Sequence, residues 1–264
     1  MKIFNEISTV ISNKCIADNI YEAYLHSPNL SKHANPGQFI NISPSENWKN
    51  VMRRPMSVAW QEDRNISIIY KVFGDGTEII SKWKKNSYVD IIGPLGNHWK
   101  DFNNKVPILI GGGVGIAPIL NLHKDLNKKE TKHILIMGAR TKEEHFMNHN
   151  EKDMIYLSTD LDEYGFKGNV IYALKKVLAN IKEEIKIFTC GPPGMMKAVS
   201  IYCKNNNIDC DLALETIMAC GIGICQGCTI VKDTESVNTY RSHYALACID
   251  GPIFNIKEIN DTFL

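Results

Sequence analysis

The fold is decided by residues 219–228, which read ACGIGICQGC. This stretch places Cys220, Cys225 and Cys228 in one short loop, and a fourth cysteine, Cys248, follows at a distance. A C-x4-C-x2-C run with a distant fourth cysteine is typical of the ligands of a plant-type [2Fe–2S] cluster. Such a cluster passes one electron at a time, so the pattern predicts an electron carrier and not a hydrolase or a scaffold.

Glycines separate these cysteines at Gly221, Gly223 and Gly227. Because glycine has no Cβ and readily adopts positive φ, the backbone there can wrap closely around an inorganic core. Backbone N–H groups that point inward can then donate to the sulfurs and adjust the reduction potential.

Two other uses of cysteine compete with this interpretation. A structural zinc site also takes four thiolates, but usually as two short-spaced pairs, whereas three come from one loop here. Disulfides are disfavoured because the first six residues, MKIFNE, lack the apolar stretch of a secretory signal. Free thiols fit a reducing compartment, so we expect a cytoplasmic protein.

Composition narrows the class of protein. The chain has 264 residues, 44% hydrophobic and 22% charged, which suffices for two compact domains and a small appendage. A net charge of +1 gives no reason to expect binding to nucleic acid or to a membrane. No run approaches the roughly 20 apolar residues that span a bilayer. We expect Cys15, Cys203 and Cys210 to be small buried or half-buried fillers.

Three units follow one another along the chain, which predicts a mixed β and α/β fold. Residues 1 to about 100 show short alternating strands typical of an antiparallel barrel. Its elements are expected at 37–42, 57–60, 66–72 and 89–92, with a helix at 76–83 and an exit turn at 93–97.

From about 101 to 210, strands alternate with helices, which predicts a parallel sheet. Its strands are expected at 106–110, 133–137, 154–158 and 186–190, with a helix at 170–178. Residues 211–264 form the cluster domain.

A glycine-rich loop, GGGVGIAP at 111–118, joins the first predicted strand of the sheet to a helix. Gly111, Gly112, Gly113 and Gly115 would let a phosphate approach the backbone, and the helix N-terminus supplies free N–H groups. Because the motif is not a complete G-x-G-x-x-G, a strand–helix turn without a ligand is the alternative.

Three further segments are candidate cofactor contacts. Arg54, next to Arg53, could clamp a pyrophosphate, although a basic surface turn has the same composition. Gly76 opens a predicted helix whose N-terminus could face a phosphate. Cys190 ends the fourth strand of the sheet, where ligands of open α/β sheets bind. Its thiol could lie beside a nicotinamide, or it could equally be a buried filler.

Taken in order, these motifs resemble the ferredoxin–NADP reductase superfamily and, within it, the electron-transfer subunits of NAD-dependent (class 1B) dihydroorotate dehydrogenases. The resemblance covers nearly the whole chain, and its last two segments are the most specific. The motifs are RPMS at 54–57, YKV at 70–72, GT at 76–77, GPLGN at 93–97, GGGVGIAP at 111–118, CGP at 190–192, E-x2-MACG-x-G-x-C-x2-C at 215–228 and AC-x-DGP at 247–252.

The resemblance implies a fold and a set of cofactors. A flavin-binding barrel would occupy 1–100, an NAD-binding domain 101–210 and a [2Fe–2S] domain 211–264, with FAD between the first two. Carried over by position, the FAD contacts would be Arg54, Pro55, Met56, Ser57, Tyr70, Lys71, Val72, Gly76 and Thr77. The cluster ligands would be Cys220, Cys225, Cys228 and Cys248.

The resemblance also implies a reaction. A separate FMN-containing catalytic subunit would oxidise dihydroorotate to orotate, a step of pyrimidine biosynthesis, and the two subunits would form a heterotetramer. Electrons would then cross the cluster and FAD to NAD⁺, and we assign no general base in this chain. Asp160 suits the ribose diol of NAD, whereas Arg140 points toward NADP and receives less weight.

Other functions are also compatible with the sequence. A reductase subunit that serves ferredoxin, glutamate synthase or sulfide has a similar layout. In related NADH-dependent ferredoxin–NADP oxidoreductases an Asp commonly stands at the position of Cys220, so the four cysteines here favour the dihydroorotate system. A redox-sensing protein without turnover and a zinc-stapled binding module are the alternatives from other classes.

Overall fold

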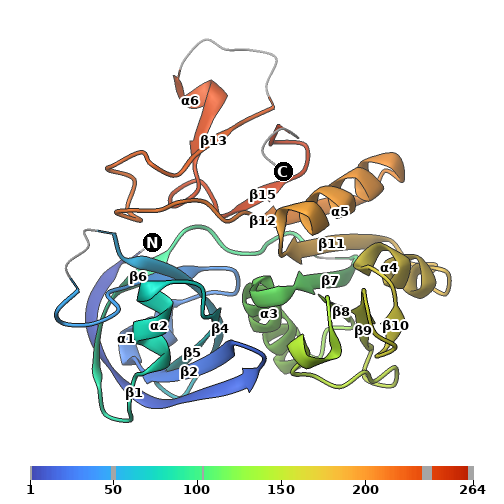
Figure 1. Ribbon diagram of the computed structural model, residues 1–264. Coiled ribbons are helices and arrows are strands. Elements are labelled where there is room, and N and C mark those ends of the chain that lie inside the picture. Colours follow the sequence, from blue (N-terminus) through green and yellow to red (C-terminus); the bar gives the residue numbers. More distant parts are fainter. Residues whose placement is uncertain (1, 49–51, 103, 234–239, 261–264) are drawn as a thin grey trace.

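A closed antiparallel barrel forms the N-terminal unit of this computed structural model, which describes residues 2–48, 52–102, 104–233 and 240–260 (Figure 1). Its strands are β1 (Phe4–Ala17), β2 (Ile20–His26), β3 (Phe39–Ile42), β4 (Arg54–Glu62), β5 (Asn65–Lys71) and β6 (Tyr88–Leu95). They close in the order β1-β2-β5-β4-β3-β6, with the short helices α1 (Pro28–His33) and α2 (Asp75–Ser81) between strands. The predicted barrel is therefore confirmed.

Side chains alternate along β3, as the period of two in a strand requires. Ile40 and Ile42 point into the barrel core, whereas Phe39 packs into the core of the second and third units. Asn41, on the same side as Phe39, is also fully buried. The outer face of β3 is thus covered by another part of the protein.

Two features of the barrel differ from the expectation. Strand β1 is 14 residues long, not short, because irregularities at Val10/Ser12 and Cys15/Ala17 bend it between β2 and β6. The segment expected as an exit turn at 93–97 instead continues β6 as far as Leu95, which pairs with Phe39. Pro94 is tolerated there because it lies at a register shift in the ladder, where no N–H is required.

The second unit is a seven-stranded sheet with the order β10-β9-β8-β7-β11-β12-β15. Its strands are β7 (Val106–Gly112), β8 (Ile134–Ala139), β9 (Ile155–Thr159), β10 (Phe166–Lys167), β11 (Ile185–Cys190), β12 (Asp209–Ala213) and β15 (Ile253–Asn255). Its helices are η1 (Gly113–Gly115), α3 (Ile116–Lys128), η2 (Lys142–Glu144), α4 (Val170–Leu178) and α5 (Pro193–Asn205). All neighbours pair in parallel except β12 and β15. The predicted parallel sheet is confirmed.

Helices cover both faces of this sheet, so its central strand β7 is buried along its whole length. Leu109 and Leu135 face α3, which also packs against the barrel. Ile108 and Ile110 face the opposite side, where α4 and α5 pack (Figure 1). The sheet is thereby held with its carboxyl edge beside the barrel.

The third unit lies above both others and contains β13 (Thr229–Val231), α6 (Tyr240–His243) and β14 (Tyr244–Leu246) (Figure 1). Its last strand, β15, joins the edge of the large sheet by pairing with β12. Two cysteines of this unit, Cys228 and Cys248, belong to the same hydrophobic core as Ile108. Among the described residues, no helix is both long enough and apolar enough to cross a lipid bilayer.

Candidate functional site

The guanidinium of Arg54 lies against the first turn of α2. A Cβ placed on Gly76 would come within 2.7 Å of Arg54 Nε, so a larger residue there would displace the Arg54 side chain from this position. Arg54 also stacks 4.9 Å from the ring of Trp48 and donates to the carbonyl of Met52 at 3.1 Å. The structure therefore brings together two predicted flavin contacts that are far apart in the sequence.

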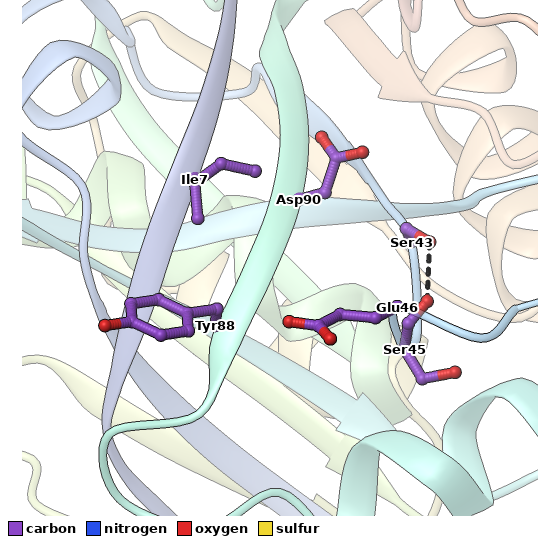
Figure 2. Close-up of a pocket in the computed structure, with 6 residues that line it drawn as sticks. All are labelled: Ile7, Ser43, Ser45, Glu46, Tyr88 and Asp90. Atoms are coloured by element: carbon purple, nitrogen blue, oxygen red, sulfur yellow. Dashed lines mark hydrogen bonds between the residues drawn. The ribbon is translucent and has the colours of Figure 1, made fainter.

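The neighbouring Arg53 is engaged elsewhere. Its Nη2 lies 2.5 Å from Asp90 Oδ2, and Asp90 is one of the residues that line a pocket beside β1 and β6 of the barrel (Figure 2). None of the predicted site residues lines this pocket, which is formed by Ile7, Ser43, Ser45, Glu46, Tyr88 and Asp90. Of the two adjacent arginines, Arg54 is the one that faces the predicted flavin segments.

Pro55, Met56 and Ser57 follow Arg54 along β4, opposite Asn41, Ile40 and Phe39 of β3. Tyr70 and Lys71 end β5, and Val72 follows them. Burial raises the pKa of Tyr70, and its hydroxyl donates to Asn13 Oδ1 at 2.9 Å inside the barrel. The Thr77 hydroxyl accepts from the backbone N–H of Phe73 at 2.8 Å. The Tyr70 hydroxyl is thus engaged inside the barrel and the Thr77 hydroxyl in the first turn of α2. The roles of these residues in FAD binding stay predictions.

Lys71 connects the barrel to the second unit. Its Nζ lies 2.9 Å from Glu144 Oε1, and the Glu144 side chain is only 13% exposed. Burial alone would raise the pKa of Glu144, but the hydrogen bond and charge of Lys71 and the N–H and charge of Arg140 lower it overall. Glu144 is therefore ionised at neutral pH and fixes the two units at this point.

A pocket of about 580 Å³ lies at the carboxyl edge of the sheet, next to Lys71 and Glu144. Gly112 and Gly113 form part of its wall. Arg140 and Asp160, which directly follow strands β8 and β9, line it as well. Gly113 has φ +54° and no atom within 4 Å of where a Cβ would stand, so its backbone is open to a ligand. This is the position at which open α/β sheets bind nucleotides.

The other two glycines of the loop are in packing contact. A Cβ on Gly111 would lie 2.2 Å from Ile116 Cδ1, and one on Gly115 would lie 2.5 Å from Gly191 Cα. Gly115 thus lets the loop lie directly on the Cys190–Gly191 backbone. Cys190 is itself 3% exposed, and burial, followed by the charge of Glu215, raises its pKa well above the usual range. Its thiol stays protonated at neutral pH.

The four predicted cluster ligands lie near one another. The thiol of Cys225 affects the pKa of Cys220, and burial, the thiol of Cys228 and the charge of Cys220 raise the pKa of Cys248. Among the described residues, no three Cys, His, Asp or Glu side chains are close enough to hold a single metal ion. All eight cysteines are free thiols.

Backbone N–H groups point at the sulfur of Cys220. Those of Cys225 and Ile222 lie 3.4 and 3.5 Å from its Sγ. Against desolvation, which raises it, these donors lower the pKa of Cys220 to about 7. Gly221 and Gly223 both have positive φ, as the wrapped loop requires. Four thiols, N–H donors aimed at sulfur and a glycine-wrapped loop fit an iron–sulfur cluster.

Two of the three cysteines outside the site that were expected to be buried or half-buried are buried, and one is not. Cys203 and Cys210 are fully buried between α5 and the sheet, as expected. Cys15 is exposed, which contradicts its prediction as a filler, because β1 presents it at the barrel surface.

Several residues of the site were missed by sequence reasoning. Asn169 caps α4, where its Oδ1 accepts from two backbone N–H groups, and it also lines the pocket. An Asn directly before an apolar helix is a recognisable N-cap signal. Glu144 and Asn41 gave no local signal, because their partners lie in other units of the fold. Asn97 stands in the GPLGN motif, but nothing in the motif indicated its contacts with Asp250 and Ile253.

Comparison with known proteins agrees with this geometry. Residues 109–200 match the model of an oxidoreductase NAD-binding domain, and residues 215–260 match the iron–sulfur cluster binding domain of dihydroorotate dehydrogenase B. The fold and site therefore define an NAD-binding oxidoreductase with an iron–sulfur domain.

Full-length relatives narrow this class. The chain is 33% identical to the electron transfer subunit of dihydroorotate dehydrogenase B (NAD(+)) of Fusobacterium nucleatum, over 98% of this chain and 99% of that protein. It is 32% identical to the subunit of the same name from Bacillus pumilus, over 95% and 96% of the two chains. The chain belongs to this family of electron transfer subunits. The predicted family, oxidoreductase activity and cofactor set of FAD, [2Fe–2S] and NAD are confirmed.

Solved structures share the architecture. A structure described as an NADH-dependent reduced ferredoxin–NADP oxidoreductase, studied for flavin-based electron bifurcation, has a TM-score of 0.84 and 28% identity, covering 97% of this chain and 91% of that chain. A ferredoxin reductase of carbazole 1,9a-dioxygenase has a TM-score of 0.64 at 18% identity, covering 79% and 67% of the two chains. The second likeness concerns the fold alone.

Proposed function

We propose that this chain carries electrons between an FMN-containing, dihydroorotate-oxidising subunit and NAD⁺, through an iron–sulfur cluster and FAD that it holds itself. The observation that carries the proposal is the contact of the barrel with both other units. Lys71 reaches Glu144 beside the nucleotide pocket, and Asn41 donates to the loop that contains Cys220. A bound flavin exchanges two electrons with a nicotinamide and single electrons with an iron–sulfur cluster, so it belongs between them.

The barrel and the pocket would hold the two dinucleotides. Arg54, lying against Gly76, would bind the FAD pyrophosphate through charge-assisted hydrogen bonds. Gly112 and Gly113 would let the NAD pyrophosphate approach their backbone. Asp160 lines the same pocket, and a carboxylate there suits the ribose diol of NAD better than a 2′-phosphate.

The cluster would be held by Cys220, Cys225, Cys228 and Cys248. Each iron of a four-cysteine [2Fe–2S] centre takes two thiolates, and Cys220 with Cys225 and Cys228 with Cys248 would supply one pair per iron. The N–H groups of Ile222 and Cys225 would donate to the Cys220 sulfur and stabilise its negative charge.

The partner surface is part of the proposal. Ile217 and Ile224, close in sequence to the cluster cysteines, are 80% and 76% exposed, and Ile249 next to Cys248 is 45% exposed. Apolar side chains exposed around a redox centre fit a surface for a second subunit. We therefore propose that a catalytic subunit docks here in a heterotetramer, in the cytoplasm, where the free thiols stay reduced.

The test is reconstitution under anaerobic conditions. The isolated chain should show flavin bands and about two irons per chain, and it should reduce ferricyanide with NADH. Dihydroorotate oxidation coupled to NAD⁺ should require the catalytic subunit, and light scattering should then give a heterotetramer. A stable monomer with full dihydroorotate activity, or a colourless protein, would refute the proposal.

One pair of variants separates the cofactors. Cys225→Ser should lose the iron signal but keep FAD and NADH–ferricyanide activity, whereas Cys15→Ser, at an exposed cysteine outside the site, should keep all three. If Cys225→Ser lost the dye reduction and kept its iron, the order of the centres would be wrong.

A second candidate is a reductase subunit that serves ferredoxin. It is favoured by the likeness to the NADH-dependent reduced ferredoxin–NADP oxidoreductase structure. Fast ferredoxin reduction by NADH in the isolated chain, without any gain of activity from a dihydroorotate-oxidising subunit, would support it.

A further inference from the structure

Two asparagines of the barrel hold the cluster unit, and neither is among the predicted cofactor contacts. Asn41 lies in β3 and is completely buried. Its Nδ2 donates to the carbonyls of Ala219 and Cys220, each at 3.3 Å, across 178 and 179 residues of sequence. The barrel therefore contacts the peptide groups on both sides of the first predicted cluster ligand.

The contact with Asn41 also explains Gly221. Its φ is +72°, and a Cβ there would lie 2.9 Å from Asn41 Nδ2 and 3.1 Å from Leu95 Cδ1. The backbone of the cluster loop thus lies directly on the amide, with no side chain between them. In β3, Asn41 stands opposite Pro55, within the segment proposed to bind FAD.

Asn97 holds the other end of the cluster unit. Its Nδ2 donates to the carbonyls of Asp250 and Ile253, both at 2.8 Å, and its Oδ1 accepts from the Ile253 N–H at 3.0 Å. The neighbouring Gly96, with φ +75°, allows close approach, because a Cβ there would lie 2.8 Å from the Gly251 carbonyl. The GPLGN segment at 93–97 therefore docks on the DGP segment at 250–252.

The two donations of Asn41 satisfy carbonyls that would otherwise lie against a buried side chain. An apolar residue of the same size at this position would leave the Ala219 and Cys220 carbonyls without this donor. Its Oδ1 is buried and accepts no hydrogen bond from any residue that the structure describes. The contacts of the Asn41 amide are therefore directed at the cluster loop.

We propose that Asn41 and Asn97 are positioning residues that fix the cluster relative to the flavin, one at each end of the cluster-binding segment. This rests on the proposed function. Asn41 sets the orientation of the peptides that flank Cys220, and Asn97 anchors the chain just after Cys248. Because electron transfer between two centres slows steeply with their separation, a fixed separation sets the rate. Hydrogen bonds from Asn41 also polarise the peptides around Cys220, which adjusts the potential of a cluster bound there.

The test compares Asn41→Leu with Asn121→Leu in the complete, cofactor-loaded chain. Asn121 is a matched control, because it is buried too and its Nδ2 donates at 3.0 Å to a barrel carbonyl, that of Val58. It joins the barrel to α3, away from the cluster loop. The readouts are the electron paramagnetic resonance spectrum and midpoint potential of the reduced cluster, and the rate of its reduction by NADH per bound flavin.

Asn41→Leu should shift the spectrum and potential and slow cluster reduction by about 10-fold or more, the usual effect of losing an outer-shell partner. Asn121→Leu should leave the spectrum and potential at wild-type values. Asn97→Asp, which keeps the acceptor for Ile253 N–H but loses both donations, is the second variant should Asn41→Leu fold poorly. Wild-type spectrum, potential and rate in both Asn41→Leu and Asn97→Asp would overturn the proposal.

Hydrogen exchange gives a readout that does not depend on electron flow. Peptides covering 215–228 and 250–256 should exchange faster in Asn41→Leu and Asn97→Asp than in Asn121→Leu. Faster exchange there, in a protein whose wild type supports no dihydroorotate oxidation after reconstitution with the catalytic subunit, would support the docking role while refuting the proposed function. Unchanged exchange, together with a wild-type cluster spectrum, would refute the docking role and leave the proposed function standing.

Discussion

Gly115→Ala should destabilise the protein although its backbone conformation suits alanine. Gly115 has φ −62° and ψ −10°, which any residue adopts. The added Cβ, however, would lie 2.5 Å from Gly191 Cα, 2.6 Å from Gly191 N and 2.7 Å from the Cys190 carbonyl carbon. Carbon atoms in contact prefer about 3.5–4.0 Å, so the two loops must separate by about 1 Å.

The size of the stability loss in Gly115→Ala depends on which atoms overlap with the new Cβ. All three are backbone atoms, so no side-chain rotation relieves the overlap, and overpacking of this kind costs about 1–3 kcal/mol. Alanine recovers part of this by restricting the unfolded chain, by about 0.4–1 kcal/mol. We expect a net loss of about 1–2 kcal/mol, or a melting temperature lower by about 2–8 °C.

The assay is thermal unfolding of the cofactor-loaded protein by circular dichroism, with NADH affinity measured in parallel. The matched control is Gly194→Ala, at the start of α5, where no atom lies within 4 Å of the new Cβ. It should melt at or above the wild-type temperature, because alanine favours a helix over glycine. NADH should bind Gly115→Ala more weakly, since Gly112 and Pro192 on the separating loops both line the pocket. A Gly115→Ala protein that melts with the wild type and keeps its NADH affinity would refute the steric argument.

Three further predictions concern charged residues. Arg54→Ala should weaken FAD binding by about 1.5–3 kcal/mol, as judged by flavin content after gel filtration, whereas Arg53→Ala, which loses only the contact with Asp90, should retain flavin. Lys186→Met should lower the free energy of unfolding by about 3–5 kcal/mol, because Asp211, 2.8 Å away and 11% exposed, loses its buried partner. Lys132→Met, at an exposed pair with Glu183, should leave the midpoint of the same urea titration close to the wild-type value. Because the folded state lowers the pKa of Glu144 from 4.5, its stabilising effect is present above pH 4.5 and is lost as the pH falls through the lower folded value. Glu144→Gln should therefore be less stable than wild type at pH 7, and the difference should shrink below pH 4.5; a difference that grows with acid would contradict the assigned ion pair.

The cluster loop could be predicted from sequence because its signal is local. Cys220, Cys225 and Cys228 lie within nine positions, and the glycines between them report the wrapped backbone directly. The parallel sheet could also be predicted from the sequence, because its strands β7 and β8 are continuous apolar runs that are buried on both faces.

Long-range contacts could not be predicted in this way. Nothing near Asn41 in the sequence indicates that its amide meets Ala219, and Lys71 gives no sign of Glu144. The direction of the Tyr70 hydroxyl depends on the pairing of β1 and β5 on either side of β2, which brings Asn13 within its reach. The packing role of Gly115 likewise depends on where the Cys190–Gly191 turn comes to lie.

The edge strand β15 has a consequence for how this protein can be divided. It supplies hydrogen-bond partners for β12, and Asn255 within it reaches both Asp209 and Asp211. If the chain were cut before residue 253, β12 would become a bare edge with unpaired N–H and C=O groups, open to strands of other molecules. The C-terminal segment therefore protects the sheet against aggregation, and the cluster unit cannot be removed as an independent module without exposing its neighbour.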